Sequence, residues 1–414
     1  WRRPPPPVPG TPTLSIVDAP DTVTKRLELL PLWPGTRALD AAPALARALA
    51  GEAALLPVPA NDPARAELLA TSQRAGEPIG GDVALVACTS GSTGTPKGAM
   101  LTPANLRASI DATHARLGGP GQWLLATPPE HIAGLQVLLR TIRAGEEPAA
   151  MDLADGFRPA AFADAIGRMT GARRYSSIVP LQLGRVLADP GATAAAASLD
   201  AVLVGGQATE PGLLRRAREA GITVVTSYGS SETSGGVVYD GMALDGVDVT
   251  IVADGRIVLT GPMVSRGYRN VDHPDLADGV FRTSDAGSLD ADGTLSVLGR
   301  VDDIIISGGL KFLPGPIESV LAAHPAVAAA AVVAVPDPDL GQAVAAAVVL
   351  ADGHSPDPAV IERELRDHCA GNLTKHETPR ILAVVKHLPT MPSGKLDRSG
   401  LTRALADRSG TMPQ

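Results

Sequence analysis

Glycines and hydroxyl residues are concentrated in one ten-residue run that directly follows an apolar segment, residues 83–87. The run reads Thr89-Ser90-Gly91-Ser92-Thr93-Gly94-Thr95-Pro96-Lys97-Gly98. Glycines let a backbone turn tightly enough for several N–H groups to point at one anion, and Ser and Thr hydroxyls add donors. The run therefore predicts a phosphate-binding loop after a strand. The simpler alternative is a polar turn between a strand and a helix.

The phosphate loop of GTPases and motor ATPases is excluded. Its pattern, G-x-x-x-x-G-K-[ST], requires Gly where Pro96 stands and Ser or Thr where Gly98 stands. The order TSGSTGTPKG instead resembles the AMP-binding signature of the acyl-adenylate-forming superfamily. That superfamily includes acyl-CoA synthetases, peptide-synthetase adenylation domains and luciferases. The resemblance implies that the chain binds ATP.

A second motif, Tyr228-Gly229-Ser230-Ser231-Glu232-Thr233, follows an expected strand at residues 222–226. It resembles the superfamily's YGxTE element, with Ser231 keeping the hydroxyl of the usual Thr. The resemblance implies that Tyr228 flanks the adenine and that Ser231 and Thr233 approach the α-phosphate. It also implies that Glu232 holds Mg²⁺, an ion that typically takes one or two carboxylates from a protein. Taken alone, a Glu is more often a solvated surface residue.

The motif series continues with an acid and a base. Asp285 suits hydrogen bonds from ribose hydroxyls, and Arg300 would add donors to the same ribose or to phosphate. The resemblance thus implies these ATP and AMP contacts: Thr89, Ser90, Gly91, Ser92, Thr93, Gly94, Thr95, Lys97, Tyr228, Gly229, Ser231, Thr233, Asp285 and Arg300.

The acyl side of the site is expected from three segments. Residues 128–135 resemble the superfamily's PxxH-xx-G element, which implies that His131 lies at the acyl pocket and takes part in catalysis. An ordinary loop or helix-start histidine is the alternative. The resemblance also places Ser177, Gly205, Gly206 and Gln207 beside the acyl group. Gln207 is a departure, because many relatives have a small residue at its position.

Two basic residues follow His131 on an expected helix. A second free carboxylate on the acid would call for a basic or donor-rich lining, and Arg140 and Arg143 are candidates for it. On a helix both side chains could equally face solvent.

The last motif, residues 389–398, matches the superfamily's P-x-x-x-x-G-K-x-x-R element. It implies that Lys395 bridges the incoming carboxylate and the α-phosphate, where a compact ammonium offsets accumulating negative charge. An isolated Lys is more often solvated. By analogy, Asp302 is a hinge, and Gly308 and Gly309 let the pantetheine arm of CoA pass close to the backbone.

Composition limits the class of protein. A chain of 414 residues suits two or three domains. The net charge of −8 and the low aromatic content argue against nucleic-acid binding. Two distant cysteines give no disulfide or zinc pattern, and no apolar run reaches about 18 residues. We therefore expect a cytoplasmic protein with no membrane span, and the oligomeric state, including a homo-oligomer, stays open.

Alternating helix and strand signals predict a layered α/β fold. We expect a disordered extension at residues 1–10, a large AMP-binding and acyl-pocket domain at residues 11–300, and a mobile, small α+β domain at residues 301–414 joined by a hinge.

The resemblance implies an AMP-forming acid–CoA ligase that uses ATP, Mg²⁺, CoA and a small carboxylic acid. The segments around His131 and Ser177 look most like the o-succinylbenzoate-CoA ligases of menaquinone synthesis. Three alternatives remain: another aryl- or fatty-acyl-CoA ligase, a peptide-synthetase adenylation domain, and a non-catalytic nucleotide-binding module. We disfavour the second because no carrier domain follows Lys395, and the third because Lys395 and Glu232 are both present.

Overall fold

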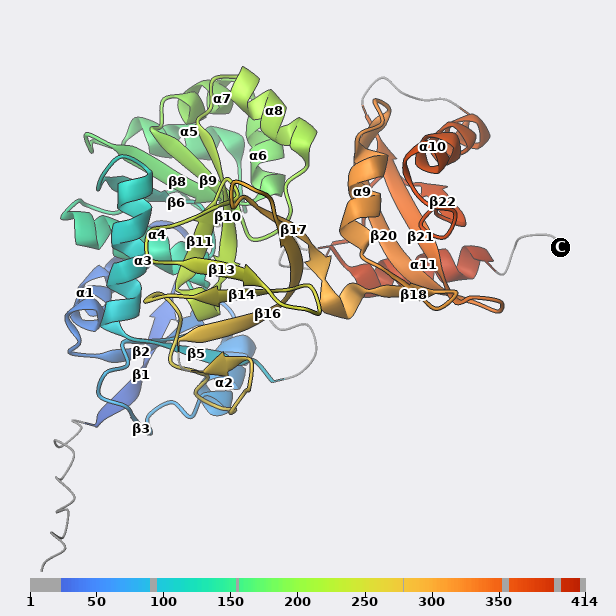
Figure 1. Cartoon of the computed structure of the whole chain (residues 1–414). Helices are drawn as coiled ribbons and strands as arrows, with labels where there is room; N and C mark the ends of the chain where they lie inside the picture. The colour runs from blue at the N-terminus through green and yellow to red at the C-terminus, as the bar shows by residue number, and fades with distance from the viewer. Residues whose placement is uncertain are drawn as a thin grey trace, which may run out of the picture.

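The computed structural model describes residues 24–89, 95–153, 156–277, 279–351, 357–390 and 396–409. The expected extension at residues 1–10 lies outside these ranges. Within them, sheets and helices alternate in layers up to Arg300, and a smaller group of strands and helices follows (Figure 1). The α/β class expected from the sequence is confirmed.

The first sheet carries the strands on either side of the glycine-rich run. Its described strands lie in the order β3-β1-β2-β4-β5, with β1, β2 and β4 parallel and β5 antiparallel to β4. They are β1 (Lys25–Leu32), β2 (Ala54–Pro59), β3 (Pro78–Ile79), β4 (Leu85–Cys88) and β5 (Gly98–Leu101). The pairing of Cys88 with Gly98 closes the two strands around the run.

The second sheet has the order β12-β11-β10-β9-β8-β6-β7 among the described strands. Its members are β6 (Gln122–Leu125), β7 (Ala149–Ala150), β8 (Arg174–Ile178), β9 (Ala201–Gly205), β10 (Val224–Ser230), β11 (Gly235–Tyr239) and β12 (Met242–Ala243). The strands from β7 to β10 are parallel, so their carboxyl ends meet at one edge. That edge is where ligands bind in such folds.

Helices fill both faces of this second sheet. One apolar core joins α1 (Ala42–Ala50), α3 (Pro103–Arg116) and α4 (Ile132–Ala144) to both sheets. A second core lies under α5 (Pro159–Gly167), α6 (Pro180–Leu187), α7 (Pro190–Ala197) and α8 (Pro211–Glu219), drawn at the top of Figure 1. α2 (Pro63–Ser72) packs on β2. The edge of the second sheet at which its parallel strands end thus lies between two packed cores, and this packing restricts its geometry.

The rest of the chain forms two more sheets. The third contains β13 (Asp248–Ile251), β14 (Arg256–Thr260), β15 (Leu276–Ala277), β16 (Val280–Leu289) and β17 (Leu295–Arg300). The fourth contains β18 (Ile305–Ser307), β19 (Leu310–Phe312), β20 (Val327–Asp337), β21 (Gly341–Leu350) and β22 (Ile381–Val384). α9 (Pro314–Ala322), α10 (Pro358–Asn372) and α11 (Arg398–Ser409) accompany the fourth sheet at the right of Figure 1.

Short-range sequence signals indicate where helices lie but not always where they end. Thr102, followed by Pro103, is a typical helix start, and Thr102 caps α3: its hydroxyl accepts from the Asn105 N–H at 3.1 Å, and the Asn105 side chain accepts from the Thr102 N–H. Helical sequence signals extend over residues 63–75 and 157–170, but the helices there, α2 and α5, are shorter in the structure.

The strand expected at residues 222–226 was placed wrongly. β10 starts at Val224 and runs on to Ser230, through a segment that we interpreted as a loop. Glycine and serine weaken strand propensity, but pairing with β11 overrides it, with a bulge between Tyr228 and Gly229. Tyr228 is therefore a strand residue.

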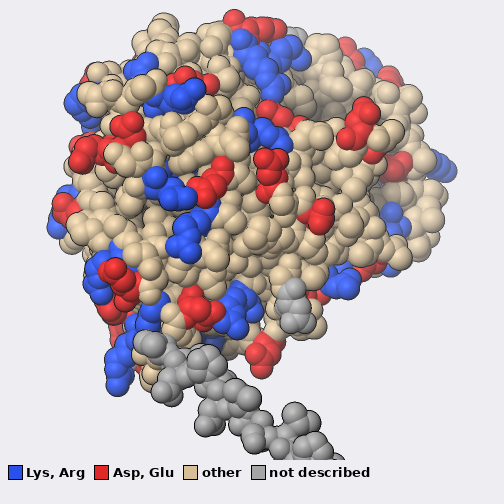
Figure 2. Space-filling view, turned by 60° about the vertical axis from the view of Figure 1, so that its left-hand side comes forward, with Lys and Arg blue, Asp and Glu red and all other residues tan. Residues whose placement is uncertain are grey.

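On the face shown in Figure 2, basic and acidic side chains are interspersed. No helix among the described residues combines the length and apolarity that crossing a membrane requires.

Candidate active site

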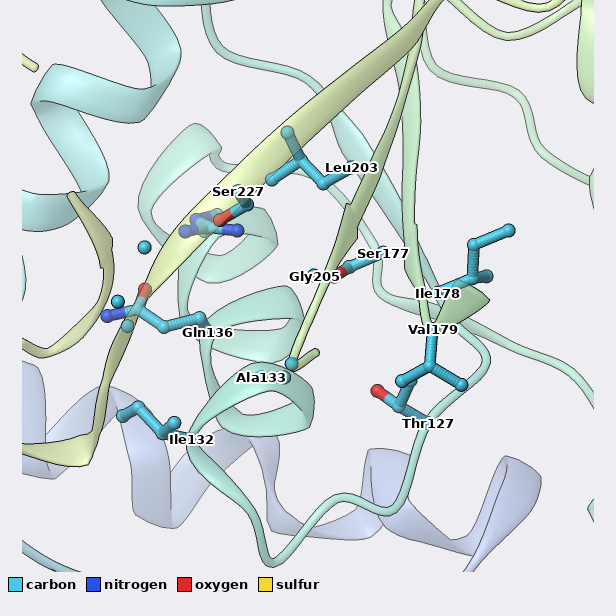
Figure 3. A pocket seen from close by; sticks show the side chains of 15 residues that line it. Thr127, Ile132, Ala133, Gln136, Ser177, Ile178, Val179, Leu203, Gly205 and Ser227 are labelled. Carbon is cyan, nitrogen blue, oxygen red and sulfur yellow. The ribbon is translucent and has the colours of Figure 1, made fainter. Parts of the chain in front are cut away.

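A cavity lies at the carboxyl edge of the second sheet, where neighbouring parallel strands end. Ser177 on β8 pairs with Leu203 on β9, and Gly205 pairs with Ser227 on β10. These positions face one hollow with an empty volume of about 600 Å³, part of it open to solvent (Figure 3). Its lining is Thr127, Ile132, Ala133, Gln136, Arg140, Ser177, Ile178, Val179, Leu203, Gly205, Gly206, Ser227, Gly229, Gly235 and Gly236.

The expected acyl residues divide into two groups. Ser177, Gly205 and Gly206 line the cavity, whereas His131 and Gln207 do not. His131 begins α4 as its N-cap residue, is half exposed, and lies 3.9 Å from the Glu130 carboxylate. The two residues after it, on the first turn of α4, reach the cavity instead.

Arg140 is the charged residue in the lining. It lies on α4 and is only 3% exposed, and its Nη2 donates to the hydroxyls of Thr113 at 3.3 Å and Tyr239 at 3.2 Å. Its guanidinium also lies 4.8 Å from the ring centre of Trp123. Burial lowers the pKa of Arg140, although Tyr239 opposes the shift. An arginine stays charged in proteins, so the cavity contains a buried positive charge.

Arg143, the other candidate, faces away from the cavity. Its Nε and Nη2 each lie 3.1 Å from an oxygen of Asp111, and both side chains are about half exposed. The sequence left open which of the two arginines faces solvent. Packing decides this: Arg140 faces the core and Arg143 faces solvent.

Buried polar atoms without partners point into the same region. Thr127 Oγ1, Gln136 Oε1 and Arg140 Nε have no hydrogen-bond partner among the described residues. Gln136 is held in place because its Nε2 donates to the Ser234 carbonyl at 2.5 Å. Buried polar atoms are nearly always paired in folded proteins. The cavity lining therefore leaves an unpaired donor on Arg140, an unpaired acceptor on Gln136 and a hydroxyl on Thr127 for a polar ligand.

The predicted nucleotide residues meet on the neighbouring strands. The Tyr228 hydroxyl donates to Asp285 at 2.8 Å, and Arg300 Nη1 lies 3.9 Å from the same carboxylate. Burial and the negative charge of Asp285 raise the pKa of Tyr228, so its hydroxyl stays protonated. Asp285 and Arg300 are directly paired across β16 and β17. The structure thus brings Tyr228 together with two residues that lie more than 50 positions further along the chain.

Glu232 lies in a short 3-10 turn after β10 and is 7% exposed. Its Oε1 accepts a 2.7 Å hydrogen bond from the hydroxyl of Tyr268. Lys97 Nζ lies 5.2 Å from the Tyr268 ring centre, so the tyrosine contacts the carboxylate and also lies near the lysine. Burial and Glu232 raise the pKa of Tyr268, which keeps this hydroxyl a donor. Tyr268 was not among the site residues expected from the sequence.

The two hydroxyls near Glu232 differ in availability. Ser231 and Thr233 are both buried. The Thr233 hydroxyl accepts from the Ser230 N–H at 2.9 Å and lies 2.8 Å from the Gly235 carbonyl, so it closes the local turn. Within the described ranges, the Ser231 hydroxyl makes no hydrogen bond. Of the two hydroxyls, that of Ser231 is therefore the one left available to a ligand.

Part of the predicted site cannot be placed. Ser90, Gly91, Ser92, Thr93, Gly94 and Lys395 lie outside the described residues. The base of the glycine-rich run is closed by a 2.8 Å hydrogen bond from the Thr89 N–H to the Lys97 carbonyl, and Thr95 is exposed.

The hinge and CoA candidates lie beyond β17. Asp302 accepts from Arg300 Nη2 at 2.8 Å. Gly308 and Gly309 form the turn between β18 and β19 with φ of +58° and +81°. L-residues with a side chain rarely adopt such angles, so glycine is needed at this turn.

The donor set fits a magnesium ion that also binds substrate phosphates. No group of three or more acidic, His or Cys side chains occurs among the described residues. Mg²⁺ does not need one, because it keeps waters and is commonly bound by one or two carboxylates plus substrate phosphates. Glu232 offers such a carboxylate, since only one of its oxygens accepts a bond from a described residue.

Comparison with known families and relatives agrees with this geometry. The AMP-binding enzyme family matches residues 34–269, and the AMP-binding enzyme C-terminal domain matches residues 316–395. A "Probable 2-succinylbenzoate--CoA ligase" of Mycobacterium tuberculosis (strain CDC 1551 / Oshkosh) is 49% identical over 369 residues, covering 88% of this chain and 94% of the relative. A "2-succinylbenzoate--CoA ligase" of Bacillus cereus (strain ATCC 14579) is 34% identical, covering 77% of this chain and 69% of the relative.

Solved structures give the same result. The o-succinylbenzoate CoA synthetase of Bacillus subtilis, in complex with the acyl-adenylate intermediate OSB-AMP, superimposes with a TM-score of 0.73 at 27% identity. It covers 92% of this chain and 88% of that chain. The same enzyme in complex with ATP and magnesium ion gives a TM-score of 0.72 at 26% identity.

Proposed function

Because the chain belongs to the AMP-binding enzyme family, we propose that it is an ATP-dependent, AMP-forming acid–CoA ligase. We propose o-succinylbenzoate as the acid and o-succinylbenzoyl-CoA as the product, as the names of the relatives indicate. The product would serve menaquinone synthesis. One observation supports this choice of acid: Arg140 is a buried guanidinium in the cavity, and it has no carboxylate partner among the described residues.

In the first step, a carboxylate oxygen of the acid attacks the α-phosphorus of ATP and pyrophosphate leaves. Lys395 would offset the charge between the two anions, and the Ser231 hydroxyl would donate to the α-phosphate. Tyr228 and Asp285 would orient the adenosine. Magnesium, held on Glu232, would neutralise the phosphate charge that otherwise repels the attacking carboxylate.

In the second step, the CoA thiol attacks the acyl carbonyl, and AMP leaves with the electrons of the broken C–O bond. We propose that residues 301–414 turn about Asp302 between the steps, which would withdraw Lys395. The Gly308-Gly309 turn would then face the acyl-adenylate and let the pantetheine arm approach the backbone. The domain at residues 11–300 would keep the nucleotide in place.

The acid is recognised at two ends in this proposal. One carboxylate meets ATP, and the other lies against Arg140 at the inner end of the cavity. A buried cation that lacks an internal counter-charge attracts an anion strongly, because water cannot screen it there. A mono-carboxylic acid of the same size would leave this cation unpaired, so the cavity favours a dicarboxylic acid.

The test is thioester formation from ATP and CoA with four acids: o-succinylbenzoate, benzoate, a medium-chain fatty acid and a mixture of amino acids. We expect strong preference for o-succinylbenzoate, with release of AMP and pyrophosphate. Turnover of another acid would keep the reaction and reject the substrate. No AMP release with any acid would favour the non-catalytic binding module. The cytoplasmic location and a homo-oligomeric state stay predictions.

A further inference from the structure

One short segment, residues 265–270, touches both parts of the predicted ATP-phosphate site. We call it the strap. On one side it borders Glu232, and on the other it lies along β5 and the residues that return from the glycine-rich run. These two neighbours are more than 130 residues apart in the sequence, so their relative position depends on contacts of this kind.

Backbone and side-chain hydrogen bonds from the strap hold residues 96–100, where the chain leaves the glycine-rich run. The Arg269 N–H donates to the Gly98 carbonyl at 2.8 Å, and the Met100 N–H donates to the Gly267 carbonyl at 2.9 Å. Asn270 Nδ2 donates to the Pro96 carbonyl at 2.9 Å, while its Oδ1 accepts from the Gly98 N–H at 3.3 Å. The two bonds of Asn270 therefore fix the peptide units on both sides of Lys97, and the two backbone bonds fix the units that follow.

A residue from a third part of the chain completes this clamp. Gln73 is fully buried after α2, and its Nε2 donates to the same Pro96 carbonyl at 2.7 Å. The carbonyl thus accepts from two amide side chains, Gln73 and Asn270. A Cβ at Gly98 would lie 2.1 Å from Gln73 Oε1, which shows how closely the clamp encloses the chain.

The strap holds Glu232 at two points. The Ser265 N–H donates to the Glu232 carbonyl at 2.8 Å, and the Tyr268 hydroxyl donates to Glu232 Oε1 at 2.7 Å. A carboxylate that accepts one fixed bond keeps its other oxygen in a defined direction. Hydrogen bonds to charged groups are among the strong ones in proteins.

We propose that Tyr268 is a positioning residue: its hydroxyl orients the metal-binding carboxylate of Glu232 relative to the side chain of Lys97. The other bonds of the strap hold Tyr268 and the segment around Lys97 in a fixed relative position. The proposal rests on the proposed function, because it assumes that Glu232 holds the magnesium of MgATP. It adds a specific role for a hydroxyl that touches neither substrate nor metal.

The apolar part of Tyr268 has a separate task. Its ring packs with Ala99, Val264 and Leu276, so the residue also supports the fold. Phenylalanine would keep this packing and the ring near Lys97 while removing only the donor. The substitution Tyr268→Phe therefore separates alignment from packing.

The experiment measures binding and activity on the full chain. Binding of α,β-methylene-ATP is measured by calorimetry with Mn²⁺ and without metal, and the half-saturating Mg²⁺ concentration is measured by ATP–pyrophosphate exchange. In Tyr268→Phe we expect analogue affinity with Mn²⁺ to fall and half-saturating Mg²⁺ to rise, each by about tenfold. Metal-free binding and the KM for the acid should stay within about twofold.

Two further variants complete the design. Asn270→Ala loosens the other side of the strap, so we expect it to weaken analogue binding with and without metal. Tyr175→Phe is the matched control, because the buried Tyr175 hydroxyl also makes hydrogen bonds, at 3.0 Å to the Leu117 and Gly119 carbonyls, away from the nucleotide residues. It should leave both metal measurements unchanged.

The outcomes are distinct. Equal Mn²⁺-dependent affinity in Tyr268→Phe and the parent chain would overturn the proposal, as would an equal shift in Tyr175→Phe. A parent chain that binds the analogue with Mn²⁺ but forms no AMP with any acid would reject the proposed function while the binding arm still decides the role of Tyr268. A parent chain that binds no analogue would reject both.

Discussion

Arg140 Nη2 lies 3.2 Å from the hydroxyl oxygen of Tyr239, and no carboxylate in the described ranges pairs with this buried guanidinium. The Tyr239 hydroxyl and the Trp123 ring hold the Arg140 guanidinium in place without neutralising its charge. A charge kept in this way is available to a ligand, and this relationship supports the first two predictions.

Replacing Arg140 should remove the preference for a dicarboxylic acid. In Arg140→Met, which keeps much of the side-chain volume, we expect the KM for o-succinylbenzoate to rise about 100-fold, since hydrogen bonds to a charged group contribute up to about 3 kcal/mol. Activity with an aromatic mono-acid should fall far less. Steady-state kinetics with both acids measure the ratio.

Arg143→Met is the control for this variant, three residues further along the same helix. Its exposed ion pair with Asp111 contributes about 0–1 kcal/mol to stability, so the KM should change less than about threefold. An equal loss of activity with both acids in Arg140→Met would contradict the assignment.

Tyr239→Phe should loosen Arg140 without removing its charge. We expect the KM for o-succinylbenzoate to rise roughly fivefold at constant kcat, because a hydrogen bond of about 1 kcal/mol that holds the guanidinium in place is lost. Thr113 shares this network, because its hydroxyl lies 3.0 Å from that of Tyr239. In a double-mutant cycle with Thr113→Val, the two effects should be non-additive. Additive effects would show that the hydroxyls act independently.

Lys395→Ala should separate the two half-reactions. We expect acyl-adenylate formation to fall by at least about 100-fold, because the positive charge between two anions is lost. Thioester formation from chemically prepared acyl-adenylate and CoA should stay within about threefold of the parent chain. Loss of both steps would contradict the proposed withdrawal of Lys395.

Gly134→Ala should destabilise the start of α4. A Cβ at Gly134 would lie 2.2 Å from the Pro128 carbonyl oxygen, and overpacking of this kind costs about 1–3 kcal/mol. Gly184→Ala, on α6 with open space around the new Cβ, should instead raise the free energy of unfolding by about 0.5–1 kcal/mol. Urea unfolding of both variants measures the difference, and equal effects would refute the steric account.

Stability should fall in mild acid because of His114. Burial lowers the pKa of His114 from 6.5 to about 4, and Arg140 adds to the shift. The unfolded chain therefore binds a proton between about pH 6.5 and pH 4 that the folded chain rejects, so the free energy of unfolding falls as the pH drops through this range. In His114→Gln the dependence should be shallower in urea unfolding across these pH values. An unchanged slope would exclude His114 as its source.

The chemistry of the site was readable from residue type and spacing. The order of glycines and hydroxyls around Lys97, and the acidic motif at Glu232, predicted a nucleotide site because these patterns are local. The alternating helix and strand signals likewise predicted the α/β class, since they depend on neighbouring residues.

Contacts between distant segments were not readable in this way. The course of β10 through Tyr228 depends on β11, and the choice between Arg140 and Arg143 depends on which face of α4 the two cores bury. The bond from Tyr268 to Glu232 joins side chains 36 positions apart. The sequence by itself determined which groups are available for chemistry, because that is a property of side chains. Only the tertiary structure decided which of them meet, because packing, strand pairing and burial are set by the whole chain at once.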